Sequence, residues 1–245
     1  MNYKIYKFSG SEILLYFAEY TLIISLTAFL FYDSIYVFFL LFPGIIFYLK
    51  YKRKQLREKR SSRIRKEFTD MIMSLSTALN AGYSIENAFR ESYRDMVGLY
   101  GEDSIMALEL KDFIKQLQIG INIEDILYDY GNRTEIEDIK DFAEVFILAK
   151  RSGGDLNKMI GHTVNILKEK EETESEVEVL LSGKKFEQRI MSFVPFGILI
   201  YLRISSRGFL DPLYHNPGGF LVMTLCLLVY AAAFFLAERI GNVKV

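Results

Sequence analysis

The sequence contains few of the residues from which metal and catalytic sites are usually built. Its 245 residues include one cysteine and two histidines. One cysteine excludes an intramolecular disulfide and a cysteine-rich zinc site, and two histidines leave little for a histidine-built metal centre. The chain also lacks the GxxxxGKS/T loop, the GxGxxG fingerprint and the HExxH motif, which bind nucleotides, dinucleotides and zinc. We therefore expect no catalytic residue, no cofactor and no metal ion, and hence no enzymatic activity.

The chain also lacks an overall charge of one sign. The formal net charge is −1, whereas nucleic-acid binding requires a basic surface, so we expect no nucleic-acid partner. The charges are nevertheless concentrated in one region. Residues 50–190 contain 24 of the 30 lysines and arginines and 26 of the 31 aspartates and glutamates. An apolar chain around one charged insert is typical of a membrane protein.

Four apolar runs, two before the insert and two after it, are candidate membrane spans. They cover residues 13–31, 34–49, 190–204 and 220–237, and the third is the shortest. A helix of about twenty apolar residues crosses the hydrocarbon core of a bilayer. Pro43-Gly44 is expected to kink or locally unwind the second helix. We predict four transmembrane helices, arranged as two hairpins.

Basic residues follow the second apolar run directly. Residues 50–66 contain ten basic residues and one acidic residue. Because basic loops stay in the cytoplasm, this segment and both termini are predicted to lie on the cytoplasmic side of the membrane. Basic side chains there are expected to contact anionic lipid headgroups. The membrane-proximal basic neck comprises Lys52, Arg53, Lys54, Arg57, Arg60, Arg63 and Arg65.

The insert is predicted to be helical throughout, because its apolar residues recur at helical spacing. A short repeat divides it: a glycine, any residue, and then a short polar residue followed by apolar positions. The glycine ends one helix and the polar residue caps the next. Three such turns predict three αα-hairpins, which form an antiparallel bundle of six helices. Thr134 and Glu137 have the spacing of a capping box at the start of one of these helices, 135–152. The turn residues are Gly82 and Ser84, Gly120 and Asn122, and Gly153, Gly154 and Asp155.

These observations predict an all-α chain in four segments: an N-terminal transmembrane hairpin (1–49), the basic neck (50–66), a cytoplasmic helical domain (67–189) and a C-terminal transmembrane hairpin (190–245). Residues 67–190 contain 14 basic and 25 acidic residues. An acidic domain is repelled by anionic lipid and is free to meet a cytoplasmic partner, although the charge could serve only solubility and topology. Clustered carboxylates could also hold a weak Ca²⁺ ion, but no calcium-loop spacing is present. The candidate partner surface comprises Glu124, Asp125, Glu135, Glu137, Asp138 and Asp141.

Glu19 is a carboxylate inside the first apolar run, and such a residue is a candidate functional site by default. It could belong to a proton or substrate path, which would make the protein a transporter or permease subunit. It also lies near the cytoplasmic end of its run, where it could reach the interface or pair within the helices. A membrane-anchored scaffold that works without a motor is the other alternative.

Several motifs occur in a characteristic order along nearly the whole chain. They are FTDMIMSLSTALNAGYSIENAF at 68–89, LQIGINIEDIL at 117–127, LAKRSGGDLNKMI at 148–160, FVPFGILIYL at 193–202 and FLDPLYHNPGG at 209–219. With the four apolar runs, they resemble the platform-protein family that shares the F domain of type II secretion systems and type IV pili. Within that family the chain is most similar to the B-type platform proteins of tight-adherence (Tad) pili, because it has one copy of the domain where others have two.

This resemblance implies a non-enzymatic scaffold in the inner membrane. A hexameric cytoplasmic ATPase would dock beneath it and drive the extraction of pilin subunits from the bilayer. The resemblance also implies a second platform protein, either a C-type Tad protein or a second copy of this chain. It supplies no catalytic residues.

Overall fold

The computed structural model describes residues 8–152, 156–206, 208–214 and 216–241. These residues form helices and turns without a β-strand, so the predicted all-α class is confirmed. The chain divides into two compact units. The bundle unit contains Arg53–Glu172, and the apolar unit contains Phe8–Lys52 and Thr173–Val245. The division does not follow the predicted segments, because most of the basic neck belongs to the bundle unit and residues 173–189 belong to the apolar unit.

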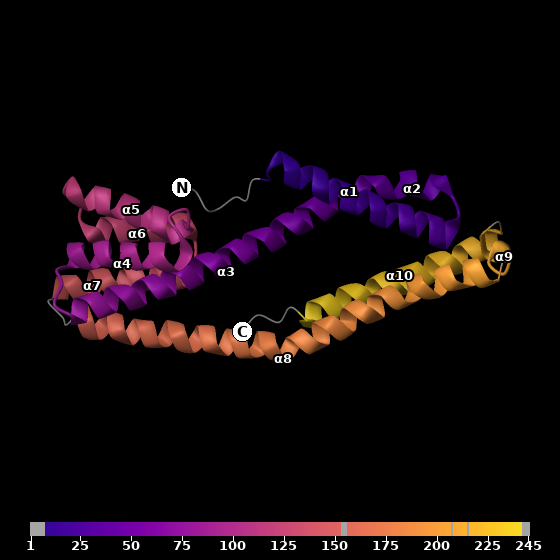
Figure 1. Ribbon diagram of the computed structural model, residues 1–245. Coiled ribbons are helices and arrows are strands. Elements are labelled where there is room, and N and C mark those ends of the chain that lie inside the picture. The colour runs from indigo at the N-terminus through magenta and orange to yellow at the C-terminus, as the bar shows by residue number, and fades with distance from the viewer. Residues whose placement is uncertain (1–7, 153–155, 207, 215, 242–245) are drawn as a thin grey trace. The chain divides into compact units, whose positions relative to one another are not determined.

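The bundle unit consists of four whole helices and parts of two longer ones (Figure 1). The longer helices, α3 and α8, each contribute residues to both units. Among the whole helices, α4 packs along α5, and α6 packs along α7. The helices are α3 (Ile45–Asn80), α4 (Ile85–Tyr100), α5 (Ile105–Gln118), α6 (Ile123–Thr134), α7 (Glu137–Ser152) and α8 (Leu156–Ser205).

A chain of aromatic contacts connects five helices in the core of the bundle unit. Phe89 of α4 meets Phe113 of α5 with 6.3 Å between ring centroids, and Phe113 meets Tyr130 of α6 at 5.4 Å. Phe68 of α3 lies 6.2 Å from Tyr130 and 5.5 Å from Phe142 of α7. All five rings are essentially inaccessible to solvent. Each such pair contributes about 0.5–1.5 kcal/mol beyond the area that it buries.

The glycines of the repeat end helices through a specific backbone geometry. Gly82 has a φ of +89°, its N–H bonds to the carbonyl of Leu79, and the N–H of Tyr83 bonds to the carbonyl of Ala78. This pattern is a Schellman motif, and the left-handed φ at its glycine is costly for other residues. Gly120, with a φ of +86°, ends α5 in the same way.

The polar residues after these glycines differ in what they do. The Ser84 hydroxyl accepts a hydrogen bond from the Asn87 N–H and caps α4. Asn122 occupies the corresponding position before α6 without a side-chain hydrogen bond. Ser104, which does not belong to the repeat, caps α5 by accepting from the Ala107 N–H. The third predicted turn, Gly153, Gly154 and Asp155, lies outside the described residues.

The predicted capping box at Thr134 is wrong. Thr134 is the last residue of α6, and its hydroxyl donates back to the carbonyls of Tyr130 and Gly131. The chain reverses at Glu135, which has a left-handed φ of 57°. Gly131 allows the close approach of α7, because a Cβ at Gly131 would lie 3.3 Å from the Lys140 Cα.

Among the described residues, three helices are long and apolar enough to cross a membrane: Gly10–Tyr32, Ile35–Asn80, whose residues beyond Lys52 belong to the bundle unit, and Pro217–Glu238. The third predicted run, 190–204, lies within α8 and is not among these three helices, so a membrane span at 190–204 stays a prediction. The elements of the apolar unit are α1 (Gly10–Thr27), the π-helical η1 (Ala28–Tyr32), α2 (Ile35–Leu41), the 3₁₀-helical η2 (Phe42–Gly44), the ends of α3 and α8, α9 (Asp211–Tyr214) and α10 (Pro217–Gly241).

The second apolar run unwinds at Pro43, as the sequence predicts. Residues Phe42–Gly44 form a 3₁₀ turn between α2 and α3, in which the Ile45 N–H bonds to the Phe42 carbonyl. The Leu41 carbonyl thereby loses its usual helical partner. The Tyr20 hydroxyl donates to this carbonyl at 2.7 Å. A side chain from α1 therefore satisfies the backbone group that the break would otherwise leave unpaired.

A polar clasp joins the two hairpins of the apolar unit. Arg203 of α8 donates to the Phe29 carbonyl at 2.6 Å and pairs with the Asp33 carboxylate at 2.5 Å. The Tyr214 hydroxyl donates to the Leu30 carbonyl at 2.7 Å. These acceptors belong to η1 and the residues beside it, where a π-helix leaves carbonyls outside the regular pattern.

Candidate partner-binding surface and its surroundings

The predicted acidic surface separates into exposed and internally paired carboxylates. Asp125, Glu137 and Asp141 are exposed. Asp138 is not part of the surface: it is only 9% exposed and lies 2.8 Å from Arg65 Nε and 2.6 Å from Lys170 Nζ. The reason is helical periodicity, because Asp138 shares a buried stripe of α7 with Phe142 and Phe146.

Two further members of the predicted surface form ion pairs within the bundle unit. Glu124 lies 2.8 Å from Lys150, and Glu135 lies 3.3 Å from Arg57. Burial acts to raise the pKa of Glu124, but its hydrogen bond from Lys150 and the positive charge of Lys150 and Arg151 outweigh burial, so its pKa is lowered. Both carboxylates therefore help to hold helices together, which reduces their availability to a partner.

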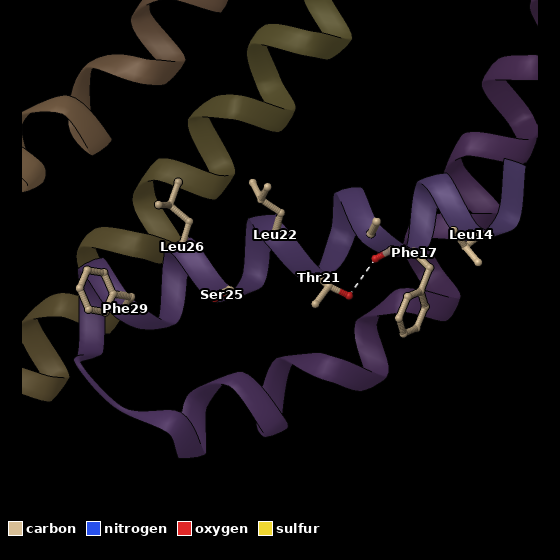
Figure 2. Close-up of a pocket in the computed structure, with 8 residues that line it drawn as sticks. Leu14, Phe17, Thr21, Leu22, Ser25, Leu26 and Phe29 are labelled. Carbon is tan, nitrogen blue, oxygen red and sulfur yellow. Dashed lines mark hydrogen bonds between the residues drawn. The ribbon is translucent and has the colours of Figure 1, made fainter. Parts of the chain in front are cut away.

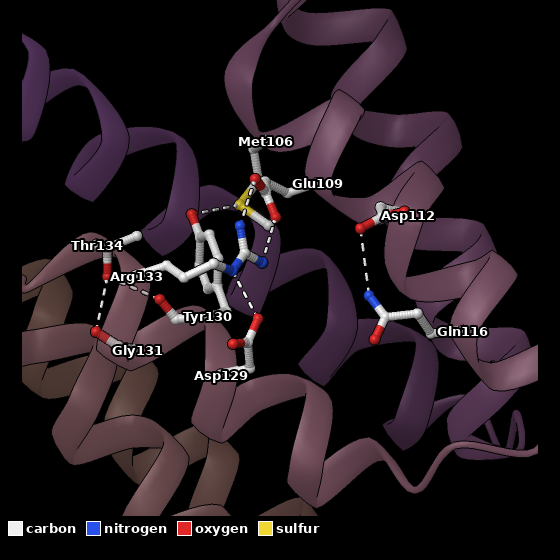
Figure 3. A network of polar contacts seen from close by, with 9 residues as sticks. All are labelled: Met106, Glu109, Asp112, Gln116, Asp129, Tyr130, Gly131, Arg133 and Thr134. Atoms are coloured by element: carbon white, nitrogen blue, oxygen red, sulfur yellow. Dashed lines mark hydrogen bonds and ion pairs between the residues drawn. The ribbon is translucent and has the colours of Figure 1, made fainter. Parts of the chain in front are cut away.

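A buried ion-pair network that the sequence analysis did not identify connects α5 and α6 (Figure 3). Glu109 is 4% exposed and accepts two hydrogen bonds from the guanidinium of Arg133, at 3.0 and 2.8 Å. Asp129 also accepts from Arg133, at 2.6 Å. These bonds, first of all those to Glu109, raise the pKa of Arg133, although burial acts in the opposite direction. Two-point contacts of this kind fix the relative position of two helices.

Glu67 is a second buried carboxylate that the sequence analysis missed. Its oxygens accept from Arg63 at 2.8 Å and from the backbone N–H of Met106 at 2.9 Å. Met106 lies in the first turn of α5, where N–H groups lack helical partners. Glu67 therefore caps α5 from α3. The sequence did indicate its burial, because Glu67 lies at helical spacing from the apolar residues Ile64 and Met71 of α3.

The basic neck is not a separate segment but a continuous part of α3. Four of its seven assigned residues form ion pairs inside their own unit: Lys52 with Glu19, Arg57 with Glu135, Arg63 with Glu67, and Arg65 with Asp138. Arg53 and Lys54 are exposed, whereas Arg60 is half-buried. Only some residues of the basic neck are therefore accessible to lipid headgroups.

Glu19 pairs with Lys52 within the apolar unit, at 3.2 Å. The Lys52 ammonium also lies 5.3 Å from the ring centroid of Tyr16 and 5.5 Å from that of Tyr48. A carboxylate in the middle of an apolar helix thereby has a counter-ion, and the lysine has two aromatic faces. This arrangement favours a structural role for Glu19 over a transport role.

An open hollow lies along α1 in the apolar unit (Figure 2). Its lining includes Leu14, Phe17, Leu22 and Phe29, and it has no ionisable side chain. The hydroxyl of Thr21 is already bonded to the Phe17 carbonyl, at 2.8 Å. An apolar lining of this kind suits lipid or an apolar helix. Among the residues that the structure describes, no group of three His, Cys, Asp or Glu residues could hold a metal ion.

The protein is therefore a helical membrane protein in which a charged helical bundle is inserted between apolar helices. The family model of the type II secretion system (T2SS) protein F matches residues 71–202, from the last third of α3 to near the end of α8. The chain belongs to this family. A search of curated proteins and a search of solved structures each found no match.

The family defines the general class of function. Its domain is found in inner-membrane platform proteins of secretion and pilus systems. Its members are structural platform proteins rather than enzymes, and they interact with secretion ATPases. Membership therefore agrees with the apolar helices in placing the protein in a membrane.

Proposed function

We propose that this protein is the inner-membrane platform of a Tad pilus or a closely related machine, and that it couples a hexameric cytoplasmic ATPase to the extraction and assembly of pilin subunits. Family membership and the motif order support this assignment. Further partners in this proposal are a C-type platform protein or a second copy of the chain, and anionic lipids at exposed basic residues such as Lys54.

The observation that carries the proposal is the continuity of two helices. Helix α3 runs from Ile45 to Asn80 and α8 from Leu156 to Ser205, and each passes from one unit into the other without a break. A helix is stiff along its axis because its backbone hydrogen bonds are internal. Force or torque applied to the bundle unit can therefore travel into the apolar unit along both helices.

The proposed topology has four spans and cytoplasmic termini. The end of α8 supplies the third span, and its apolar side chains support this: Phe193 is 69% exposed and Ile204 is 75% exposed. Such exposure is unfavourable in water but ordinary in lipid. The alternative of a transporter is weaker, because Glu19 is paired with Lys52 and the hollow on α1 has no ionisable lining.

The test of the coupling is to interrupt α8 where its neighbours impose no constraint. Gly183 lies within α8, and no atom approaches within 4 Å of the position that its Cβ would take. Gly183→Pro should abolish pilus assembly, because proline removes a helical hydrogen bond and bends the helix. Gly183→Ala is the matched control and should assemble pili normally. Normal assembly by Gly183→Pro, at equal protein levels, would contradict a rigid link.

A second measurement separates a motor platform from a passive scaffold. The full-length protein in lipid nanodiscs should bind the secretion ATPase of the same system and change its rate of ATP hydrolysis. Binding without any change in ATP hydrolysis, together with normal pilus assembly by Gly183→Pro, would favour a scaffold that works without a motor.

A further inference from the structure

The bundle unit has one helix face that combines exposed carboxylates with exposed apolar side chains. Glu137, Asp141, Glu144 and Leu148 follow one another at intervals of four, three and four residues along α7, so they lie on one face of the helix. All four are exposed, and Leu148 is 69% exposed. Val145, beside them, is 42% exposed. We call these five residues of α7 the outer face.

The neighbouring helix extends this face. Helix α6 packs along α7, and the Glu124–Lys150 ion pair joins the start of α6 to the end of α7. On α6, Asp125 and Tyr128 are exposed, and Tyr128 is 57% exposed. The two helices thus present acidic and apolar side chains in one layer.

The carboxylates of this layer differ from the buried acidic residues of the bundle unit. Glu67, Glu109 and Asp138 are buried and paired, as described above. Within the described part of the chain, Asp125, Glu137, Asp141 and Glu144 form no ion pair. Like charges three or four residues apart on a helix repel one another. Positive charge from outside the chain would relieve that repulsion.

We infer that the outer face of α7, with Asp125 and Tyr128 of α6, is the docking surface for the secretion ATPase, and that the ATPase meets it with a basic surface around an apolar pocket. This inference rests on the proposed function and adds to it the surface and the chemistry of recognition. Leu148 and Val145 are the apolar anchors, and the carboxylates around them steer the encounter and set its orientation.

Charge complementarity selects this occupant over two others. An anionic lipid surface would be repelled by four unpaired carboxylates. A second copy of the chain that used the same face would place like charges opposite one another, which is costly across an isologous interface. A partner with a basic surface is the occupant that this face attracts.

The experiment measures binding of the ATPase to the full-length protein in nanodiscs at several salt concentrations. Asp141→Lys with Glu144→Lys should weaken binding by about tenfold and remove most of its salt dependence, because rim charges act through long-range attraction. Leu148→Ser should weaken binding by about fivefold and leave the salt dependence unchanged, because it removes an apolar anchor. Glu102→Lys with Asp103→Lys, in the exposed α4–α5 loop, is the control of equal charge change and should bind like the wild type.

The outcomes separate the inference from the proposed function. If the wild type binds and the outer-face variants bind equally well, the docking surface is overturned while the platform function stands. If the wild type neither binds the ATPase nor changes its turnover, both fail. If the outer-face variants change the oligomeric state but not ATPase binding, the face belongs to a second copy and the inference is wrong. Circular dichroism melts of each variant exclude loss of folding as the cause.

Discussion

Both units of this protein contain ion pairs, but the polar contacts between their helices differ. In the bundle unit, buried carboxylates pair with basic side chains, as Glu109 does with Arg133. In the apolar unit, hydroxyls donate to backbone carbonyls, as Tyr20 does to Leu41 and Tyr230 does to Ser192. The bundle unit faces water and tolerates charged side chains on its surface, whereas the apolar unit must satisfy its backbone groups without water. The comparison shows that the two units are built for different solvents.

The two units also differ in where their apolar side chains lie. The bundle unit encloses rings such as Phe68 and Tyr130 completely, whereas the apolar unit leaves residues such as Leu14 and Met191 exposed, at 73% and 67%. Apolar burial therefore stabilises the first unit directly. In lipid that driving force between helices is absent, and specific packing and hydrogen bonds hold the second unit together.

The largest expected effect comes from the aromatic core of the bundle unit. Phe68→Ala should lower the free energy of unfolding of this unit by about 3–5 kcal/mol, because it leaves a cavity among fully buried rings. Denaturant unfolding of the full-length protein in detergent, followed by circular dichroism, measures the change. Leu99→Ala, at a position 66% exposed on α4, should change stability by less than about 0.5 kcal/mol. Equal effects of the two substitutions would contradict an enclosed aromatic core in the bundle unit.

The next largest effect comes from the buried ion pair. Glu109→Leu should destabilise the bundle unit by about 2–3 kcal/mol, because it removes the carboxylate that holds the partly buried Arg133 guanidinium at two points. The double variant Glu109→Leu with Arg133→Leu should recover part of this loss, because no unpaired charge remains. Additive effects of the two substitutions in the same unfolding measurement would show that the pair does not act as a unit.

These buried pairs also show how far the sequence could be used. Helical periodicity predicted the all-α class, the glycine repeat predicted the turns at Gly82 and Gly120, and Pro43 predicted the unwinding of the second run. Each of these features depends on local backbone chemistry. No local pattern could identify the partner of Glu109, because Arg133 lies 24 residues away and the pairing depends on how two helices pack. Asp138 was assigned to the surface on charge alone, although its spacing from Phe142 indicated a buried stripe.

The polar clasp tests the other side of the comparison. Arg203→Met keeps an unbranched apolar stem but removes the guanidinium, and with it the bonds to Asp33 and the Phe29 carbonyl. The free energy of unfolding should fall by about 1 kcal/mol, because polar contacts between membrane helices are individually weak. Spin labels on the two hairpins should report a broader distance distribution by electron paramagnetic resonance. Tyr201→Met, on an exposed position of the same helix, should leave the distribution unchanged.

The smallest effect concerns the pH dependence of the bundle unit. Because Lys150 lowers the pKa of Glu124 in the folded state, that carboxylate stabilises the fold above its unfolded pKa of about 4.3. This contribution is lost as the pH falls through the lower, folded pKa, since the unfolded chain binds the proton more readily. Glu124→Gln should therefore cost less than about 1 kcal/mol at pH 7 and nothing at a pH below the folded value. Unfolding measured from pH 7 down to pH 3 should show the wild-type and Glu124→Gln curves converging. Curves that stay parallel would mean that the Glu124–Lys150 pair makes no contribution, and that Glu124 is as available to a partner as Asp125.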